Sequence, residues 1–97
     1  MPGARILNHH AGLVNRMAET VGVDLSHSLA AGHLSGEDWR GMVMRCTQCA
    51  DPVACQGWLA THQGETVVAA PAWCRNEAQM RRLQVTARDD ADKDEVA

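Results

Sequence analysis

The spacing of four cysteines is the feature that most constrains what this chain of 97 residues can fold into. Cys46, Cys49, Cys55 and Cys74 follow the pattern C-x2-C-x5-C-x18-C. A chain of this length buries a modest hydrophobic core and often needs a metal, a disulfide or a partner for stability. The core is further limited because the chain has three Trp and neither Phe nor Tyr. The cysteines therefore indicate a site that contributes to the fold.

Three kinds of site are compatible with this spacing. A four-iron cluster takes one thiolate per iron, commonly from three nearby cysteines and one remote cysteine. A zinc ion is usually held by two separate C-x2-C pairs, and this chain has only one. A disulfide framework is typical of secreted proteins, and the N-terminus carries no continuous apolar segment like that of a secretory signal. We rank the cluster first, zinc second, and disulfides or free thiols third.

Hydrophobic periodicity predicts an all-α fold, a small single-domain bundle of four to five short helices. Helices are expected over residues 8–23, 25–31, 36–46, 52–62 and 77–86. Their expected capping residues are Asn8, Asp24, Ser35 with Asp38, Asp51 before Pro52, and Asn76. The β-prone residues 65–70 lack a partner strand and are expected to form an extended linker. All four cysteines then lie at helix ends, where their sulfurs can converge.

Charge divides the chain into a helical metal-binding domain, residues 1–87, and a disordered acidic tail, residues 88–97. The tail holds five acids and two bases and so accounts for the whole formal charge of −3. It has one branched apolar residue and no periodicity, which is typical of a solvated segment. Because the chain has no net basic character, nucleic-acid binding is not expected. No apolar run has the length of a membrane span, so a cytoplasmic protein is expected. Its expected partner is another protein.

The C-x2-C pair is not expected to act as a dithiol oxidoreductase. Reactive pairs of that kind lie at a helix N-terminus, where the helix dipole lowers the thiol pKa. Here Cys46 and Cys49 are predicted at a helix C-terminus. The chain also lacks a glycine-rich phosphate loop and a G-x-S-x-G turn. We therefore expect that the protein is not an enzyme.

The histidines are secondary candidates for the site. His62 lies on the same predicted helix face as Cys55 and could replace a cysteine as ligand, although a partly exposed surface or capping role fits it better. His9 and His10 are adjacent on a helix and point about 100° apart, so they make a poor joint site.

Arg45 and Arg75 each adjoin a cysteine and could offset the charge of four thiolates, or be ordinary helix-end and loop residues. Trp58 and Trp73 lie close to cysteines in the sequence and could shield a centre from water, or simply form part of the core.

Several segments resemble an uncharacterised family of small α-proteobacterial proteins, a domain of unknown function. They are RMAETVGVDL (16–25), R-C-x-x-C (45–49), D-P-x-x-C-x-x-W-L (51–59) and P-x-x-C-R-N (71–76). The resemblance covers nearly the whole expected domain and implies no activity. The local spacing C-x2-C-x5-C is similar to that of three cluster ligands in WhiB-like iron–sulfur regulators, which implies ligation by Cys46, Cys49 and Cys55. The remote cysteine precedes the triplet in that family, whereas Cys74 follows it, so neither the fold nor the DNA-binding role is implied.

The sequence thus predicts a small metal-binding protein that carries a four-cysteine iron–sulfur cluster (4Fe-4S). The expected ligands are Cys46, Cys49, Cys55 and Cys74, and the expected role is redox or iron sensing or electron transfer. The alternative is a zinc-stapled protein-interaction module without a redox role.

Overall fold

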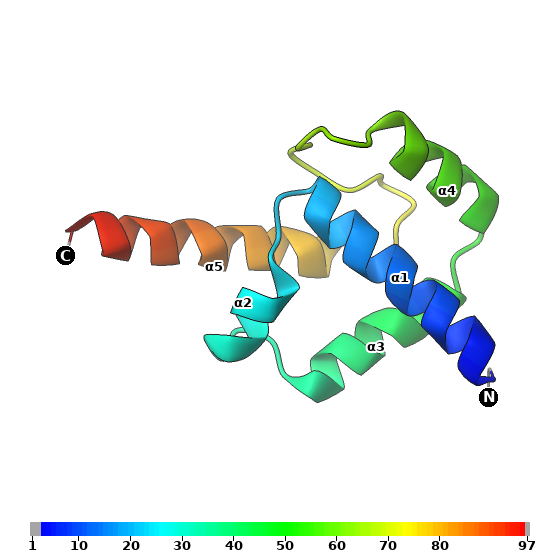
Figure 1. The fold of residues 1–97 in the computed structure, drawn as a ribbon, viewed down its shortest axis with the longest axis horizontal. Coiled ribbons are helices and arrows are strands. Elements are labelled where there is room, and N and C mark those ends of the chain that lie inside the picture. The colour runs from blue at the N-terminus through cyan, green and yellow to red at the C-terminus, as the bar shows by residue number, and fades with distance from the viewer. Residues whose placement is uncertain (1–2, 97) are drawn as a thin grey trace.

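The computed structural model describes the backbone of residues 3–96 and the side chains of residues 3–90. This part of the chain forms five α-helices and no strand, which confirms the predicted all-α fold (Figure 1). The helices are α1 (Ala4–Thr20), α2 (Leu25–Ala30), α3 (Gly36–Thr47), α4 (Pro52–Thr61) and α5 (Glu77–Val96). None of them is both long enough and apolar enough to cross a membrane.

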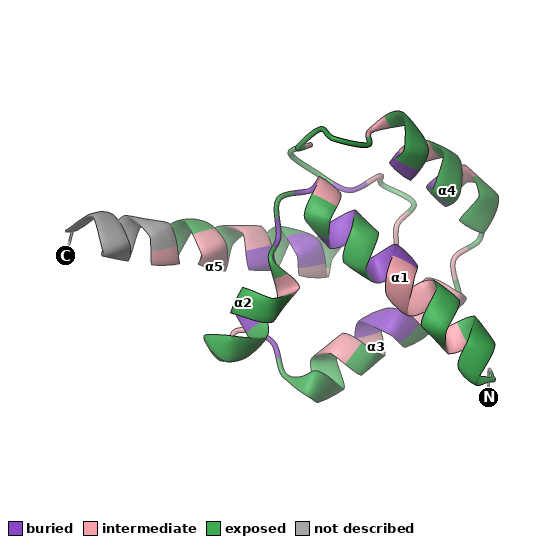
Figure 2. Cartoon of the chain, in the orientation of Figure 1, coloured by how far each residue is buried: buried purple, intermediate pink, exposed green. Residues whose placement is uncertain are grey.

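Helix α1 is the central element of the fold. It packs against α3 and α4, which lie on different sides of it (Figure 1). Apolar residues recur along its inward face at spacings of three and four, and they are the ones that become buried (Figure 2). The largest fully buried side chains of the core are Met42, Met80, Leu83 and Val14, from α3, α5 and α1. Since the chain has no Phe or Tyr, methionine fills much of this core.

The predicted helix starts are confirmed at α2, α3 and α4. Asp24 accepts a hydrogen bond from the backbone N–H of His27. Ser35 and Asp38 form a reciprocal capping box at α3. Asp51 accepts from the N–H of Ala54, with proline in the first turn of α4. These starts were predictable because a capping residue acts on backbone groups only two or three positions away.

Two helices differ from their predicted ranges. α1 ends at Thr20 rather than at Val23, because Gly22 turns the chain at φ +77°. α1 begins at Ala4 rather than near Asn8, because residues 4–7 are good helix formers and Leu7 packs against the core. α5 continues from the expected end near residue 86 to Val96, through a stretch free of Gly and Pro. The division into a domain and a dispensable tail at residue 88 stays a prediction, and the side chains of residues 91–97 lie outside the described part.

The connection between α4 and α5 is long and irregular, and it passes over the end of α1 (Figure 1). The N–H of Val67 donates to the carbonyl of Thr20 at 2.8 Å. Gln84 of α5 donates its side-chain amide to the carbonyls of Val21 and Val68. Gly22, at φ +77°, makes the turn after α1 that this segment packs against. These contacts fix the path of the chain toward Cys74.

Candidate metal centre

The four cysteines lie at or beside helix ends, as predicted. Cys46 is in the last turn of α3, and Cys49 follows that helix, with its N–H donating to the carbonyl of Cys46 at 3.1 Å. Cys55 is in the first turn of α4, and its N–H donates to the carbonyl of Asp51. Cys74 precedes α5 in a turn closed by its N–H and the carbonyl of Pro71 at 2.9 Å.

The fold brings all four cysteines around one small cavity of about 20 Å³. This is close to the space that one water molecule occupies. Leu13, Pro52 and Trp73 complete much of its wall with apolar surface. All four cysteines have free thiols in this conformation.

Three side-chain hydrogen bonds join the end of α3, which carries Cys46, to the α4–α5 connection, which carries Cys74. Arg45 donates from Nε to the Oδ1 atom of Asn76 at 2.9 Å, and Asn76 donates from Nδ2 to the carbonyl of Met42 at 2.8 Å. Arg75 donates from Nε to the carbonyl of Gln48 at 2.8 Å. Asn76, predicted as the cap of α5, therefore directs its buried side chain to α3 instead. The two arginines beside the cysteines act as clamps between segments.

Without a bound cation, the surroundings of the thiols disfavour their ionisation. Burial, and then the neighbouring sulfurs, raise the pKa of Cys46 to about 12. Burial, and then the sulfurs of Cys74 and Cys49, raise the pKa of Cys55 to about 11, with Arg16 acting in the opposite direction. Burial also raises the pKa of Cys74, against a hydrogen bond from the backbone N–H of Asn76. A bound cation would reverse this balance, because metals bind thiolates and displace their protons.

Helix α1 contributes side chains that sequence analysis did not assign to the site. His10 places its Nδ1 atom 3.4 Å from the Sγ atom of Cys46. Leu13 lines the cavity, and Arg16 is close enough to influence Cys55. The three residues recur every third position and so share one face of the helix. This spacing was visible in the sequence, but nothing local indicated that the face meets the cysteines.

His62 is not brought to the cavity. Its Nδ1 atom lies 2.7 Å from the carbonyl of Trp58, one turn back on its own helix, and its ring stacks on that indole at 4.3 Å between centroids. The capping alternative therefore describes His62, and Trp58 packs against the core rather than lining the cavity.

Among the residues that the structure describes, no three His, Cys, Asp or Glu side chains are arranged so that they could hold one metal ion. The four cysteines line one cavity, but they do not form such a group. That they hold one centre together stays a prediction.

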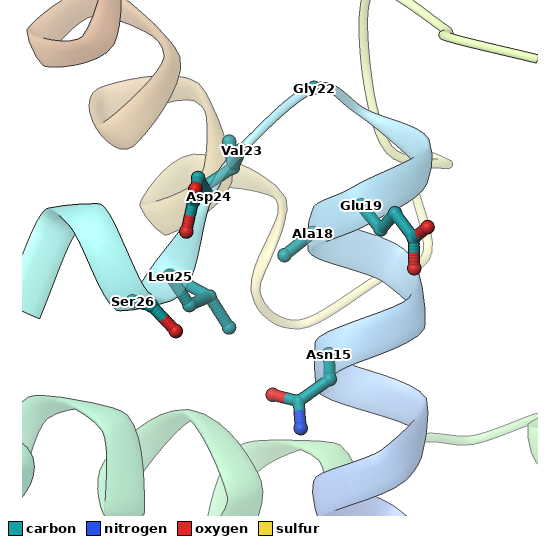
Figure 3. Close-up of a pocket in the computed structure, with 8 residues that line it drawn as sticks. All are labelled: Asn15, Ala18, Glu19, Gly22, Val23, Asp24, Leu25 and Ser26. Carbon is teal, nitrogen blue, oxygen red and sulfur yellow. The ribbon is translucent and has the colours of Figure 1, made fainter.

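A larger groove, of about 450 Å³, lies away from the thiols at the corner between α1 and α2 (Figure 3). It contains two carboxylates, Glu19 and Asp24, which lie on opposite sides of the view. Asp24 is engaged as the cap of α2. The groove therefore offers no paired acids for catalysis and no cysteine.

Comparison with known proteins identifies a family. No curated protein and no solved structure matches the chain. A family of unknown function, DUF6455, matches residues 1–86, which confirms the expected resemblance to an uncharacterised domain. The likeness to WhiB-like proteins stays one of cysteine spacing. By this match over most of its length, the chain belongs to DUF6455.

Proposed function

We propose that this protein is a small metal-binding protein that holds a four-iron iron–sulfur cluster (4Fe-4S) on Cys46, Cys49, Cys55 and Cys74. The observation that carries the proposal is the cavity shared by these four residues, which come from three separate parts of the chain. Four thiols that line one cavity form a donor set suited to iron–sulfur clusters and to zinc.

The spacing of the cysteines favours a cluster over a single ion, because three of them lie close together in the sequence and the fourth is remote. A zinc ion is usually held by two separate C-x2-C pairs, and this chain has only one. A four-iron cluster takes one thiolate at each iron, so its ligand sulfurs lie farther apart around a common volume. The cavity must widen to admit a cluster. Cys49 and Cys74 lie outside the helices, where the backbone adjusts most easily.

The surroundings of the cavity suit a redox centre. Trp73 and Leu13 place apolar surface beside the thiols, which limits access of water. Arg16 of α1 acts to lower the pKa of Cys55, and so reduces the cost of gathering negative charge. When bound, the cluster would supply a single-electron couple. The polypeptide would set its potential and its exposure.

The proposed role is redox or iron sensing or electron transfer in the cytoplasm, without enzymatic catalysis. A reducing compartment keeps four free thiols available for a metal. An electron carrier or sensor acts on another protein. Trp73 lines the cavity and is 41% exposed, so a partner protein that contacts this side chain would lie close to the centre.

The test is anaerobic purification followed by analysis of iron, acid-labile sulfide and zinc. We expect iron and sulfide in comparable amounts, with broad visible absorption that disappears on oxidation. Each of the four Cys→Ser variants should lose this content. Gln48→Ala is the matched control, because this exposed residue lies between Cys46 and Cys49 and should leave the content unchanged.

Stoichiometric zinc without sulfide would instead favour the zinc-stapled interaction module. Folded protein that contains neither metal under these conditions would contradict both functions.

A further inference from the structure

His10 is the described side chain that approaches a candidate ligand sulfur most directly from outside the cysteine set. Its Nδ1 atom lies 3.4 Å from the Sγ atom of Cys46, across 36 residues of sequence. The contact joins α1 to the last turn of α3, two helices that pack against each other. Both side chains are partly buried, so water competes only in part for this hydrogen bond.

The neighbouring residues of α1 show that His10, and not His9, faces the cysteines. His9 is adjacent in sequence but exposed, and its ring meets that of His10 edge to face at 5.3 Å between centroids. Leu13, one turn further along α1, lines the cysteine cavity. The face of α1 that meets the site therefore includes His10 and excludes His9.

We propose that His10 is a positioning residue of the four-cysteine centre, which donates a hydrogen bond from its imidazole to the sulfur of Cys46 and thereby strengthens metal binding. The inference rests on the proposed function. A thiolate that is bound to a metal has lost its proton and can only accept a hydrogen bond, so the ring nitrogen facing it must be the donor. Such a bond fixes the direction of the sulfur and stabilises its charge.

The expected size of the effect follows from comparable outer partners of metal ligands. Removal of such a partner commonly weakens metal affinity by about 10- to 100-fold. We expect the lower end of this range for His10, because the bond is partly exposed and supports one of four ligands.

The experiment measures Co²⁺ affinity of the reduced, metal-free protein by chelator competition under anaerobic conditions. Four proteins are compared: wild type, His10→Ala, His10→Asn and His9→Ala. The Asn variant is the conservative rescue, because its side-chain amide nitrogen is the same number of bonds from the backbone as Nδ1 of histidine. Thermal unfolding of each metal-free protein checks that α1 is intact. Alanine should not disrupt this helix, because it has a high helix propensity.

We expect His10→Ala to bind Co²⁺ about tenfold more weakly, His10→Asn to recover most of the loss, and His9→Ala to match wild type. The thiolate-to-cobalt absorption should keep its intensity in all four proteins, because the ligand sulfurs are unchanged. A rescue by Asn together with unchanged metal-free stability would support a hydrogen bond to the sulfur rather than a general packing effect.

Equal affinity in wild type and His10→Ala would overturn the inference, as would equal losses in His10→Ala and His9→Ala. Wild-type protein that binds no Co²⁺ would also overturn it. The proposed cluster is judged separately by the iron and sulfide analysis, so failure of the His10 role and failure of the proposed function are distinguishable.

Discussion

The side-chain amide of Asn76 is buried where the α4–α5 connection meets α3, and it is 3% exposed. Its oxygen accepts from Arg45 and its nitrogen donates to the carbonyl of Met42. Both halves of the amide are therefore used, and the residue lies two positions after Cys74. Its hydrogen bonds hold that cysteine close to Cys46.

Replacement of Asn76 by aspartate should destabilise the fold by about 1–3 kcal/mol, the usual cost of an unsatisfied buried group. Aspartate keeps the acceptor for Arg45 but cannot donate to Met42. Urea unfolding of the metal-free protein measures the change. The matched control is Asn15→Asp, because Asn15 is exposed and accepts a long hydrogen bond of 3.4 Å from Trp39. Equal losses in the two variants would contradict the role of Asn76.

The raised thiol pKa values predict that the metal-free fold loses stability at alkaline pH. An unfolded thiol ionises near pH 8.5, whereas the pKa is about 12 for Cys46 and about 11 for Cys55 in the fold. The unfolded chain then binds fewer protons than the folded chain, so the free energy of unfolding falls as the pH rises from about 8.5 toward these values. The chain has no Tyr, and its basic side chains are eight Arg and Lys93, so few other groups titrate there.

Urea unfolding of reduced, metal-free protein between pH 8 and pH 10.5 tests this, with Cys46→Ser as the comparison. The variant has one fewer perturbed thiol, and its stability should fall less steeply with pH. The same slope in both proteins would show that the thiols are not the cause.

At the scale of elements, α5 extends beyond the part of the helix that carries the core residues Met80 and Leu83. In this extension the Oδ2 atom of Asp90 lies 2.8 Å from Nε2 of His33 and 3.2 Å from Nε2 of His27. These imidazoles lower the pKa of the Asp90 carboxyl. Through this contact, the acidic segment is attached to α2 and to the turn that follows α2.

Truncation after Ala87 should leave a folded protein whose loss of stability equals that of full-length Asp90→Asn. Thermal unfolding compares the two at neutral pH. Because the pKa of Asp90 is lowered in the fold, its contribution is present above the ordinary pKa of aspartate, near 3.9, and is lost as the pH falls below it. The difference between wild type and Asp90→Asn should therefore shrink in acid. A truncated protein that is far less stable than Asp90→Asn would show that other residues of the segment 88–97 also stabilise the domain.

At the scale of the whole molecule, the four cysteines connect α3, α4 and the start of α5 around one cavity. A metal centre there would join three elements that a small core with few aromatic residues holds weakly by itself. Since ligands that bind only the folded state stabilise it, metal at 100 times its dissociation constant adds about 2.7 kcal/mol.

Removal of metal should therefore lower the unfolding temperature, and the difference should vanish in Cys74→Ser. Anaerobic thermal unfolding with and without a chelator measures this, with Gln48→Ala expected to behave as wild type. Wild-type protein that unfolds at the same temperature before and after complete metal removal would exclude a structural role for the centre.

The sequence by itself determined the helical class, the starts of α2, α3 and α4, and the placement of the cysteines at helix ends. These features depend on periodicity and on hydrogen bonds that reach only three residues, such as that between Asp51 and Ala54. The extent of α5 was misjudged because an acidic composition does not by itself exclude helix, and its contact with His33 spans 57 residues.

Only the tertiary structure decided which side chains meet around the thiols. His10 reaches Cys46 across 36 residues, and Asn76 reaches Met42 across 34. Contacts at such separations depend on how α1 and the α4–α5 connection pack against α3, and no local pattern encodes that packing. The sequence could therefore identify the cysteines as a set. The fold was needed to show that they share one cavity, and that a histidine of α1 contacts the sulfur of Cys46.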